Sequence, residues 1–149
     1  PSLGLLTLNA LVAADEVLLP IQCEYYALEG VTQLMRTIEA VRHAMNKELR
    51  LGSILMTMFD GRTRLSTQVD EEVRTHFARE TMSTRIPRSV RVSEAPSYSR
   101  SVLTYEPTSA GAVAYREAAA EFAKRHACDE HSTNTSGVKH PDASDTKKG

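Results

Sequence analysis

The sequence is poor in cysteine and in aromatic residues. Its 149 residues contain two cysteines and no tryptophan, and aromatic residues make up 5% of the chain. Cys23 and Cys128 lie far apart and cannot build a disulfide framework, so we expect a reducing, cytoplasmic environment. His126 and His131 flank Cys128, but the surrounding residues are polar and the spacing is not that of a zinc site. The sequence therefore predicts no metal centre.

Long apolar runs are also missing. The most apolar stretch, residues 3–19, is interrupted by Thr7, Asn9, Asp15 and Glu16, whereas a helix needs about 20 apolar residues to cross a bilayer. No basic segment precedes this stretch, as a secretory signal would require. Because the chain begins at Pro1 without an initiator methionine, we expect it to be a fragment of a longer protein.

Lysine is absent from one arginine-rich segment. Residues 62–100 contain eight arginines and five acidic residues. Arginine suits bidentate contacts with phosphate. On charge alone, however, an ordinary solvated face is the simpler interpretation.

The spacing of apolar residues predicts helices that alternate with strands. Ser2 is a candidate cap for the first helix, and Pro20 is expected near the end of a strand buried on both faces. We expect helices near 5–14, 27–46, 67–79 and 109–125, strands near 17–21, 49–58 and 84–86, and an extended piece near 102–103.

This alternation indicates an α/β fold with a mostly parallel sheet and flanking helices. Residues 1–125 contain too few strands for a complete doubly wound domain, so we expect an open sheet edge and exposed apolar surface. Residues 126–149 are polar and are predicted to form a disordered tail.

Three segments carry a resemblance to a known family. They read PSLGLLTLNA (1–10), PIQCEYYALEG (20–30) and MFDGRTRL (58–65), the last followed by IPRSVRVSEAPS (86–97). Together they resemble the C-terminal part of ParA/Soj-type chromosome-partitioning ATPases. These are P-loop NTPases of the deviant Walker superfamily, which also contains MinD and the nitrogenase iron protein. The resemblance covers residues 1 to about 125.

The resemblance implies a cytoplasmic, nucleoid-associated ATPase. Such a protein binds ATP and Mg²⁺, dimerises on ATP, binds DNA without sequence preference and segregates chromosomes or plasmids with a ParB partner. No membrane contact is implied.

The phosphate-binding motif of the family is missing from this sequence, which contains no Gly-Lys-Ser/Thr. Such a loop holds the phosphates through backbone N–H groups and a lysine. The Walker B aspartate would fall just before Pro1. We therefore assign no catalytic residue here and expect no ATP hydrolysis by this chain alone, an expectation that magnesium-dependent turnover by the pure chain would contradict.

The resemblance also implies roles for individual residues. Pro1, Ser2 and Gly4 would lie in a switch loop beside the γ-phosphate, although Ser2 alone reads equally as a helix cap. Met58, Pro87 and Arg88 would contact the nucleotide base beyond the strand ends. The alternative is that these residues only mark the change from strand to loop.

The resemblance implies that Arg62 and Arg91 contact DNA, because they match the positions that do so in the family. Both are expected in polar loops, where a guanidinium can reach a phosphate. The alternative is that they are solvated surface arginines, which is our preferred interpretation of three further candidates, Arg64, Arg85 and Arg100.

Three neighbouring features have weaker interpretations. Residues 24–29, with Tyr25 and Tyr26, either lie near the dimer partner or pack a helix start. Cys23 reads as a small core residue because no histidine lies near it to activate it. Asp60 could orient Arg62 or the loop backbone.

Three other functions compete with the leading one. A MinD-like positioning ATPase would need an amphipathic C-terminal helix, which residues 126–149 do not offer. A truncated, non-catalytic module that binds DNA or ParB fits the missing phosphate loop. A metabolic relative, such as an amidoligase-type synthetase, fits the segments 62–64 and 86–97 less well.

Overall fold

The computed structural model describes residues 4–133, with side chains described for residues 4–127. Its elements are α1 (Leu5–Ala13), β1 (Glu16–Gln22), α2 (Ala27–Ala44), β2 (Arg50–Phe59), α3 (Arg64–His76), β3 (Thr81–Pro87), α4 (Val90–Glu94), the 3₁₀ helix η1 (Ala95–Tyr98), α5 (Val102–Tyr105) and α6 (Ala110–Thr133).

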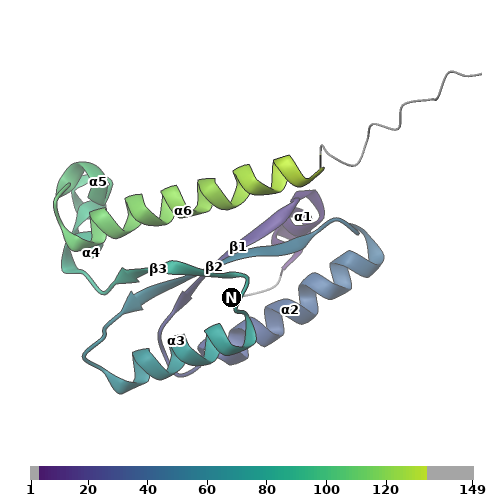
Figure 1. Cartoon of the computed structure of the whole chain (residues 1–149), viewed down its shortest axis with the longest axis horizontal. Helices are drawn as coiled ribbons and strands as arrows, with labels where there is room; N and C mark the ends of the chain where they lie inside the picture. The colour runs from purple at the N-terminus through teal and green to yellow at the C-terminus, as the bar shows by residue number, and fades with distance from the viewer. Residues whose placement is uncertain (1–3, 134–149) are drawn as a thin grey trace, which may run out of the picture.

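The three strands form one parallel sheet in the order β1-β2-β3. Helices α2 and α3 connect successive strands and lie on one face of the sheet, while α6 covers the other face (Figure 1). The predicted fold class, a parallel α/β sheet with flanking helices, is confirmed.

Alternate residues of β2 point into two separate cores, as the pleat of a strand dictates. Ile54 and Met56 pack among side chains of α2 and α3, whereas Leu55 packs with β3 against alanines of α6. The central strand is thus covered on both faces, which explains its long apolar sequence.

Helix α2 follows the predicted spacing, with Val31, Ile38 and Val41 buried. Asn46 follows its end, and the Asn46 side-chain amide donates to the carbonyls of Leu11, Val12 and Ala14 at 2.8–3.2 Å. One side chain therefore satisfies the carbonyls that the end of α1 leaves free.

Helix α3 begins three residues earlier than predicted. The Thr63 hydroxyl accepts a hydrogen bond from the Ser66 amide and caps the helix, and threonine is favoured at that position. The first turn then runs from Arg64, and the helix ends at His76 rather than near 79.

The extended piece predicted near residues 102–103 is wrong, because these residues begin the one-turn helix α5. The Ser101 carbonyl accepts from the amides of Thr104 and Tyr105. Val102 is buried with Ala95 and Ala112, so one apolar contact fixes a helical turn that is too short for periodicity to reveal.

Helix α6 is longer than predicted, since it continues to Thr133 and the predicted boundary at residue 126 lies inside it. His126 accounts for part of this extension: its ring contacts the Phe122 carbonyl and the carboxylate of Glu16 on β1. The remainder of the predicted tail, residues 134–149, lies outside the described residues.

Strand β1 is not buried on both faces as predicted. Its exposed residues alternate, and Leu18 retains 44% of its accessible surface. Pro20 pairs in register with Leu55, and it is tolerated there because β1 is an edge strand of the described sheet. The predicted open edge and exposed apolar surface are therefore present.

Between residues 4 and 133, no helix is both long and apolar enough to cross a membrane.

Candidate functional site

The carboxyl ends of β2 and β3 meet at one edge of the sheet. Phe59 and Pro87 are register partners, and the Arg88 amide donates to the Phe59 carbonyl at 3.0 Å. The loops that follow these strands therefore start side by side, at the left end of the sheet in Figure 1. In open parallel sheets this edge is where ligands bind.

Met58 has an unusual backbone conformation at this edge. Its φ of 54° lies in the left-handed region, which side chains with a Cβ rarely adopt. The β2–β3 register shifts between Met56 and Phe59, so the strained residue coincides with the point where regular pairing ends. Strain of this kind is often retained where it aims a side chain at a ligand.

The loop after β2 holds Arg62 in a defined position. Asp60 Oδ1 accepts from the Arg62 amide at 3.1 Å and from its Nε at 2.9 Å, and Oδ2 accepts from Nη2 at 2.9 Å. These hydrogen bonds to Arg62 lower the pKa of Asp60 to about 2. The Arg62 side chain is nevertheless 89% exposed, so it faces solvent.

Arg91 lies in the short helix α4 that follows β3, not in a loop as predicted, and it is held in a similar way. Arg91 Nη1 donates to Glu94 Oε2 at 3.1 Å, and this hydrogen bond raises the pKa of Arg91, with Tyr105 adding to the effect. The Tyr105 ring stacks on Tyr98 with 4.9 Å between centroids. Arg91 therefore projects beside an aromatic pair on the same edge as Arg62.

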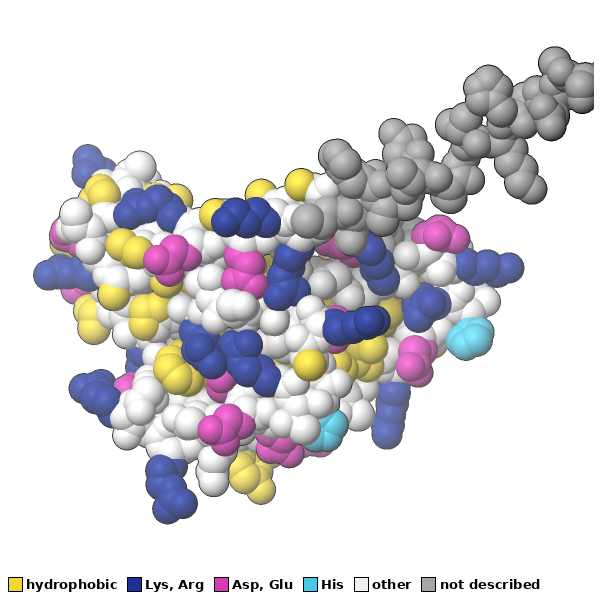
Figure 2. Space-filling model, viewed as in Figure 1, with side chains coloured by type: hydrophobic (Ala, Val, Ile, Leu, Met, Phe, Trp, Pro, Cys, Tyr) yellow, Lys and Arg dark blue, Asp and Glu magenta, His cyan; other side chains and the backbone are white. Residues whose placement is uncertain are grey.

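Cationic side chains are spread over the face seen in Figure 2, interspersed with acidic ones. Several of them lie at the left end, where Figure 1 places the carboxyl ends of the strands. Cationic groups at this end can attract a polyanion.

Arg85, one of the candidate helpers, is partly exposed and is tied to the buried Asp70. Its Nε and Nη2 donate to Asp70 at 3.0 and 2.6 Å, and its guanidinium lies 5.3 Å from the Phe59 ring centroid. Asp70 also accepts from Arg74. This ion cluster was not predicted, and only the spacing of four residues between Asp70 and Arg74 could have suggested part of it.

Asp70 is 4% exposed, and its pKa reflects two opposing effects. Burial alone would raise the pKa, but the hydrogen bonds from Arg85 and Arg74 outweigh burial and lower it. The carboxylate therefore stays charged and links α3 to β3.

The predicted switch residues are only partly visible. Pro1 and Ser2 lie outside the described residues, and the residue that precedes the first turn of α1 is Gly4 rather than the predicted Ser2. The structure brings Met58, Pro87 and Arg88 together through the pairing of Phe59 with Pro87 and the hydrogen bond from the Arg88 amide to Phe59.

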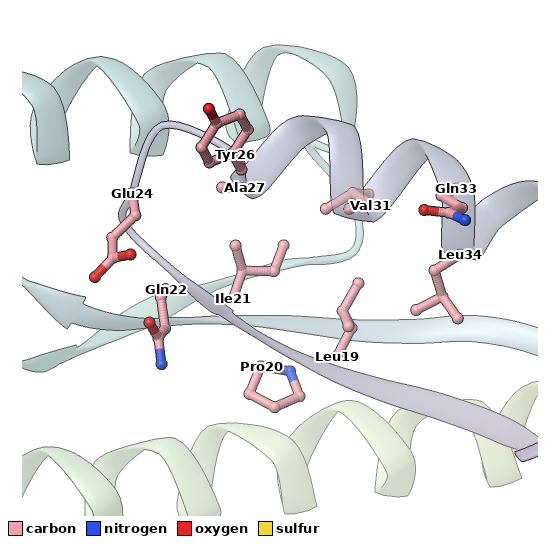
Figure 3. Close-up of a pocket in the computed structure, with 11 residues that line it drawn as sticks. Leu19, Pro20, Ile21, Gln22, Glu24, Tyr26, Ala27, Val31, Gln33 and Leu34 are labelled. Carbon is pink, nitrogen blue, oxygen red and sulfur yellow. The ribbon is translucent and has the colours of Figure 1, made fainter. Parts of the chain in front are cut away.

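An apolar cavity of about 300 Å³ lies between β1 and the start of α2. Leu19 and Ile21 of β1 face Val31 and Leu34 of α2 across it, and Tyr26 closes one end (Figure 3). Gln22, the last residue of β1, also lines the cavity, so it extends along the outer strand β1 to that strand's carboxyl end.

Two of the weaker interpretations are now decided. Tyr25 and Tyr26 are 77% and 74% exposed, so they do not pack the helix start as buried residues. Cys23 is buried, and desolvation raises its pKa to about 11, which keeps the thiol protonated. Within residues 4–127, no group of three or more acidic, His or Cys side chains could hold a metal ion.

The chain is similar to several proteins of known name. A family model described as "AAA domain" matches residues 1–51. The chain is 50% identical over 123 residues to the sporulation initiation inhibitor protein Soj of Bacillus subtilis, and 53% identical over 125 residues to the chromosome-partitioning ATPase Soj of Thermus thermophilus. These alignments cover 83% and 84% of the chain but only 49% and 50% of the two relatives, so the chain spans about half their length.

Solved structures share the fold. A crystal structure of cobyrinic acid a,c-diamide synthase from Mycobacterium smegmatis with ADP and magnesium matches with a TM-score of 0.60 and 38% identity, over 78% of this chain and 41% of that one. The same protein with an ATP analog and magnesium gives 0.62 and 39%, over 78% and 42%.

Proposed function

Over most of its length this chain is a homologue of the Soj/ParA chromosome-partitioning ATPases, and from this we propose that it supplies the DNA-contacting loops and part of the nucleotide site of such an ATPase. The whole protein would dimerise on ATP, bind DNA without sequence preference and act with a ParB partner at the nucleoid.

The observation that carries the proposal is the meeting of two loops at one sheet edge. The Phe59–Pro87 pairing starts two segments side by side, the loop that contains Arg62 and the segment that leads into α4 with Arg91. Two exposed arginines on one rigid edge can contact phosphates of the same duplex, and such contacts carry no sequence information. The proposed lack of sequence preference follows from this chemistry.

The described residues fit one end of a nucleotide. Met58, Pro87 and Arg88 offer apolar surface and strand-end backbone for a base, as strand ends do in this fold class. The phosphate end has no counterpart, because the sequence contains no Gly-Lys-Ser/Thr. ATP with magnesium would supply the dimerisation signal, and the residues that hold its phosphates, with Pro1, Ser2 and Gly4 nearby, would be completed by sequence beyond this chain.

The test is a double charge reversal in the full-length protein. Arg62→Glu with Arg91→Glu should abolish ATP-dependent DNA binding, measured by fluorescence anisotropy with a random-sequence duplex, and should spare dimerisation, measured by light scattering. Each lost phosphate contact also reduces the slope of log K against log salt by about 0.9.

A matched control changes two exposed arginines of α2, Arg36 and Arg42, to glutamate. It alters net charge equally but leaves the sheet edge intact. Wild-type DNA affinity in the Arg62→Glu/Arg91→Glu variant at physiological salt would contradict the assignment of these arginines to DNA binding.

Two alternatives have a specific observation in their favour. The solved structures described as a synthetase keep the metabolic alternative open, although the curated relatives, which are more similar in sequence, are partitioning proteins. The missing phosphate motif favours a non-catalytic DNA- or ParB-binding module. Magnesium-dependent ATP turnover by the full-length protein, stimulated by DNA and ParB, separates both from the leading proposal.

A further inference from the structure

The two arginines assigned to DNA share a local feature. Arg62 is paired with Asp60, two residues earlier in its loop, and Arg91 is paired with Glu94, three residues later in α4. Other arginines also form ion pairs, but Arg74 and Arg85 do so with the buried Asp70. The pairs of Arg62 and Arg91 are local and exposed, at the positions where phosphate contact is proposed.

The Asp60–Arg62 pair has the geometry that a phosphate would use. A guanidinium presents five N–H donors in a flat fork, and two parallel N–H···O bonds are its preferred arrangement with a carboxylate or a phosphate. Asp60 engages the Nε and Nη2 donors, each at 2.9 Å. A phosphate that binds this edge of Arg62 must first displace Asp60.

The carboxylate of Asp60 also disfavours phosphate binding at the remaining edge of the Arg62 guanidinium. A phosphate that approaches Nη1 still lies within a few ångströms of Asp60, and at that distance two like charges repel even in water. The pair has no net charge, so it also attracts a polyanion less than a free arginine would. Asp60 therefore weakens phosphate binding on either edge.

Stability does not explain these pairs. The Arg62 side chain is 89% exposed, and Arg91 and Glu94 are 55% and 41% exposed; exposed ion pairs contribute little to folding. The loop has its own support, since the Thr63 amide and hydroxyl both donate to the Asp60 carbonyl at 3.0 Å.

We propose that Asp60 and Glu94 are intramolecular competitors of DNA phosphate, which hold Arg62 and Arg91 in a paired state that DNA must break. This inference rests on the proposed DNA-binding function. The two carboxylates weaken non-specific binding, which keeps the attachment reversible.

The experiment measures DNA affinity of the full-length protein with ATP and magnesium for four variants. Asp60→Asn, Glu94→Gln and their combination remove the competing charges, while an asparagine oxygen still accepts from the Arg62 amide and preserves the turn. Glu48→Gln is the matched control, because Glu48 is exposed at the opposite end of the sheet and forms no ion pair among the described residues. The readout is fluorescence anisotropy of a labelled random-sequence duplex between about 50 and 200 mM salt.

We expect each single variant to bind about threefold to fivefold more tightly and the combination about tenfold, with the salt slope steeper by about 0.9 for each arginine released. Glu48→Gln should leave both unchanged. Placing Asp60→Asn in an Arg62→Ala background should remove the gain, because the competitor then has no arginine to hold.

Unchanged or weaker binding by Asp60→Asn would overturn the proposal and make Asp60 a residue that positions Arg62 for DNA. A gain that persists in the Arg62→Ala background would also overturn it, since the effect would then be one of general charge. Failure of the underlying function has a separate signature, namely wild-type affinity in the Arg62→Glu/Arg91→Glu variant.

Discussion

At the scale of single residues, Glu121 shows how one side chain of α6 fixes the backbone of β3. Its carboxylate accepts from the Ser83 amide, the Thr84 amide and the Thr84 hydroxyl at 2.7–2.9 Å. Arg125, one turn later, donates to the carboxylate as well. Burial alone would raise the pKa of Glu121, but these hydrogen bonds outweigh it and lower the pKa to about 2.

This lowered pKa predicts acid sensitivity. A carboxylate whose pKa is lowered in the folded state stabilises the fold when the pH is above its pKa in the unfolded chain, about 4.3. This contribution is lost as the pH falls toward 2. Glu121→Gln should therefore lower the free energy of unfolding by about 2 kcal/mol at pH 7 and by much less at pH 2 to 3. Urea unfolding at both pH values checks this.

Glu117→Gln provides the control, because Glu117 is exposed on the preceding turn of the same helix. It should change neither the stability nor its dependence on pH. An equal loss for Glu121→Gln at both pH values would show that shape rather than charge matters at this position.

The residues of the site were predictable to different degrees. Arg62 and Arg91 were singled out through the family resemblance, because charge and position alone favour an ordinary solvated arginine. Arg85 could not be assigned, since its partner Asp70 lies fifteen residues earlier and meets it only after α3 folds back on the sheet. The left-handed conformation of Met58 has no sequence signal, because left-handed residues are normally glycine or asparagine.

At the scale of elements, the contact between the end of α6 and β1 depends on a protonated imidazole. Both ring nitrogens of His126 face acceptors, the Phe122 carbonyl and the Glu16 carboxylate, so both must carry a proton. The Phe122 carbonyl, then Glu16, raise the pKa of His126, while nearby Arg50 opposes them.

This geometry predicts lower stability above neutral pH. A group whose pKa is raised in the folded state contributes its full stabilisation when the pH is below its pKa in the unfolded chain, about 6.5. The stabilisation is lost as the pH rises through the pKa of the folded state. Because His126 is over a third exposed, solvent screening limits the effect to at most about 1 kcal/mol. Denaturant unfolding at pH 6 and pH 8 measures it, and His126→Gln should abolish the difference; an unaltered pH dependence would contradict the assignment.

The elements that sequence predicted well are those with repeated spacing. Helix α2 buries one face at helical spacing, and strand β2 buries a continuous run, residues 53–56, so their existence and type followed from the pattern. The turn α5 contains one buried residue, Val102, and gives no period to detect. The end of α6 depends on a contact with Glu16, 110 residues away in sequence, which no local pattern reveals.

At the scale of the whole molecule, the sheet is covered unevenly. α2 and α3 cover one face, α6 covers β3 and β2 on the other, and β1 keeps Leu18 and Pro20 exposed beside α6. The relatives are about twice as long as the matched region, so in a full-length protein we expect further structure to cover β1.

Leu18→Lys tests this expectation. In this chain alone, where Leu18 is exposed, the free energy of unfolding should change by less than about 0.5 kcal/mol. In the full-length protein the buried lysine should cost about 2 kcal/mol or more. Leu19→Lys is the matched comparison, since Leu19 faces the core and should destabilise both forms; equal tolerance of Leu18→Lys in both forms would show that β1 stays uncovered.

The two outer strands of the described sheet also differ in whether side chains form hydrogen bonds with their outer backbone groups. On β3, Glu121 holds the amides of Ser83 and Thr84, and Arg125 holds the carbonyls of residues 79–81, so the chain seals that border with its own side chains. Among the side chains of residues 4–127, none makes hydrogen bonds of this kind along the outer border of β1. A sheet with one sealed and one open border can be extended on one side only, so two copies that joined through β1 would close on each other and stop at a pair. Although the fold leaves apolar surface open at β1, it therefore does not allow the head-to-tail repetition of copies from which fibres grow.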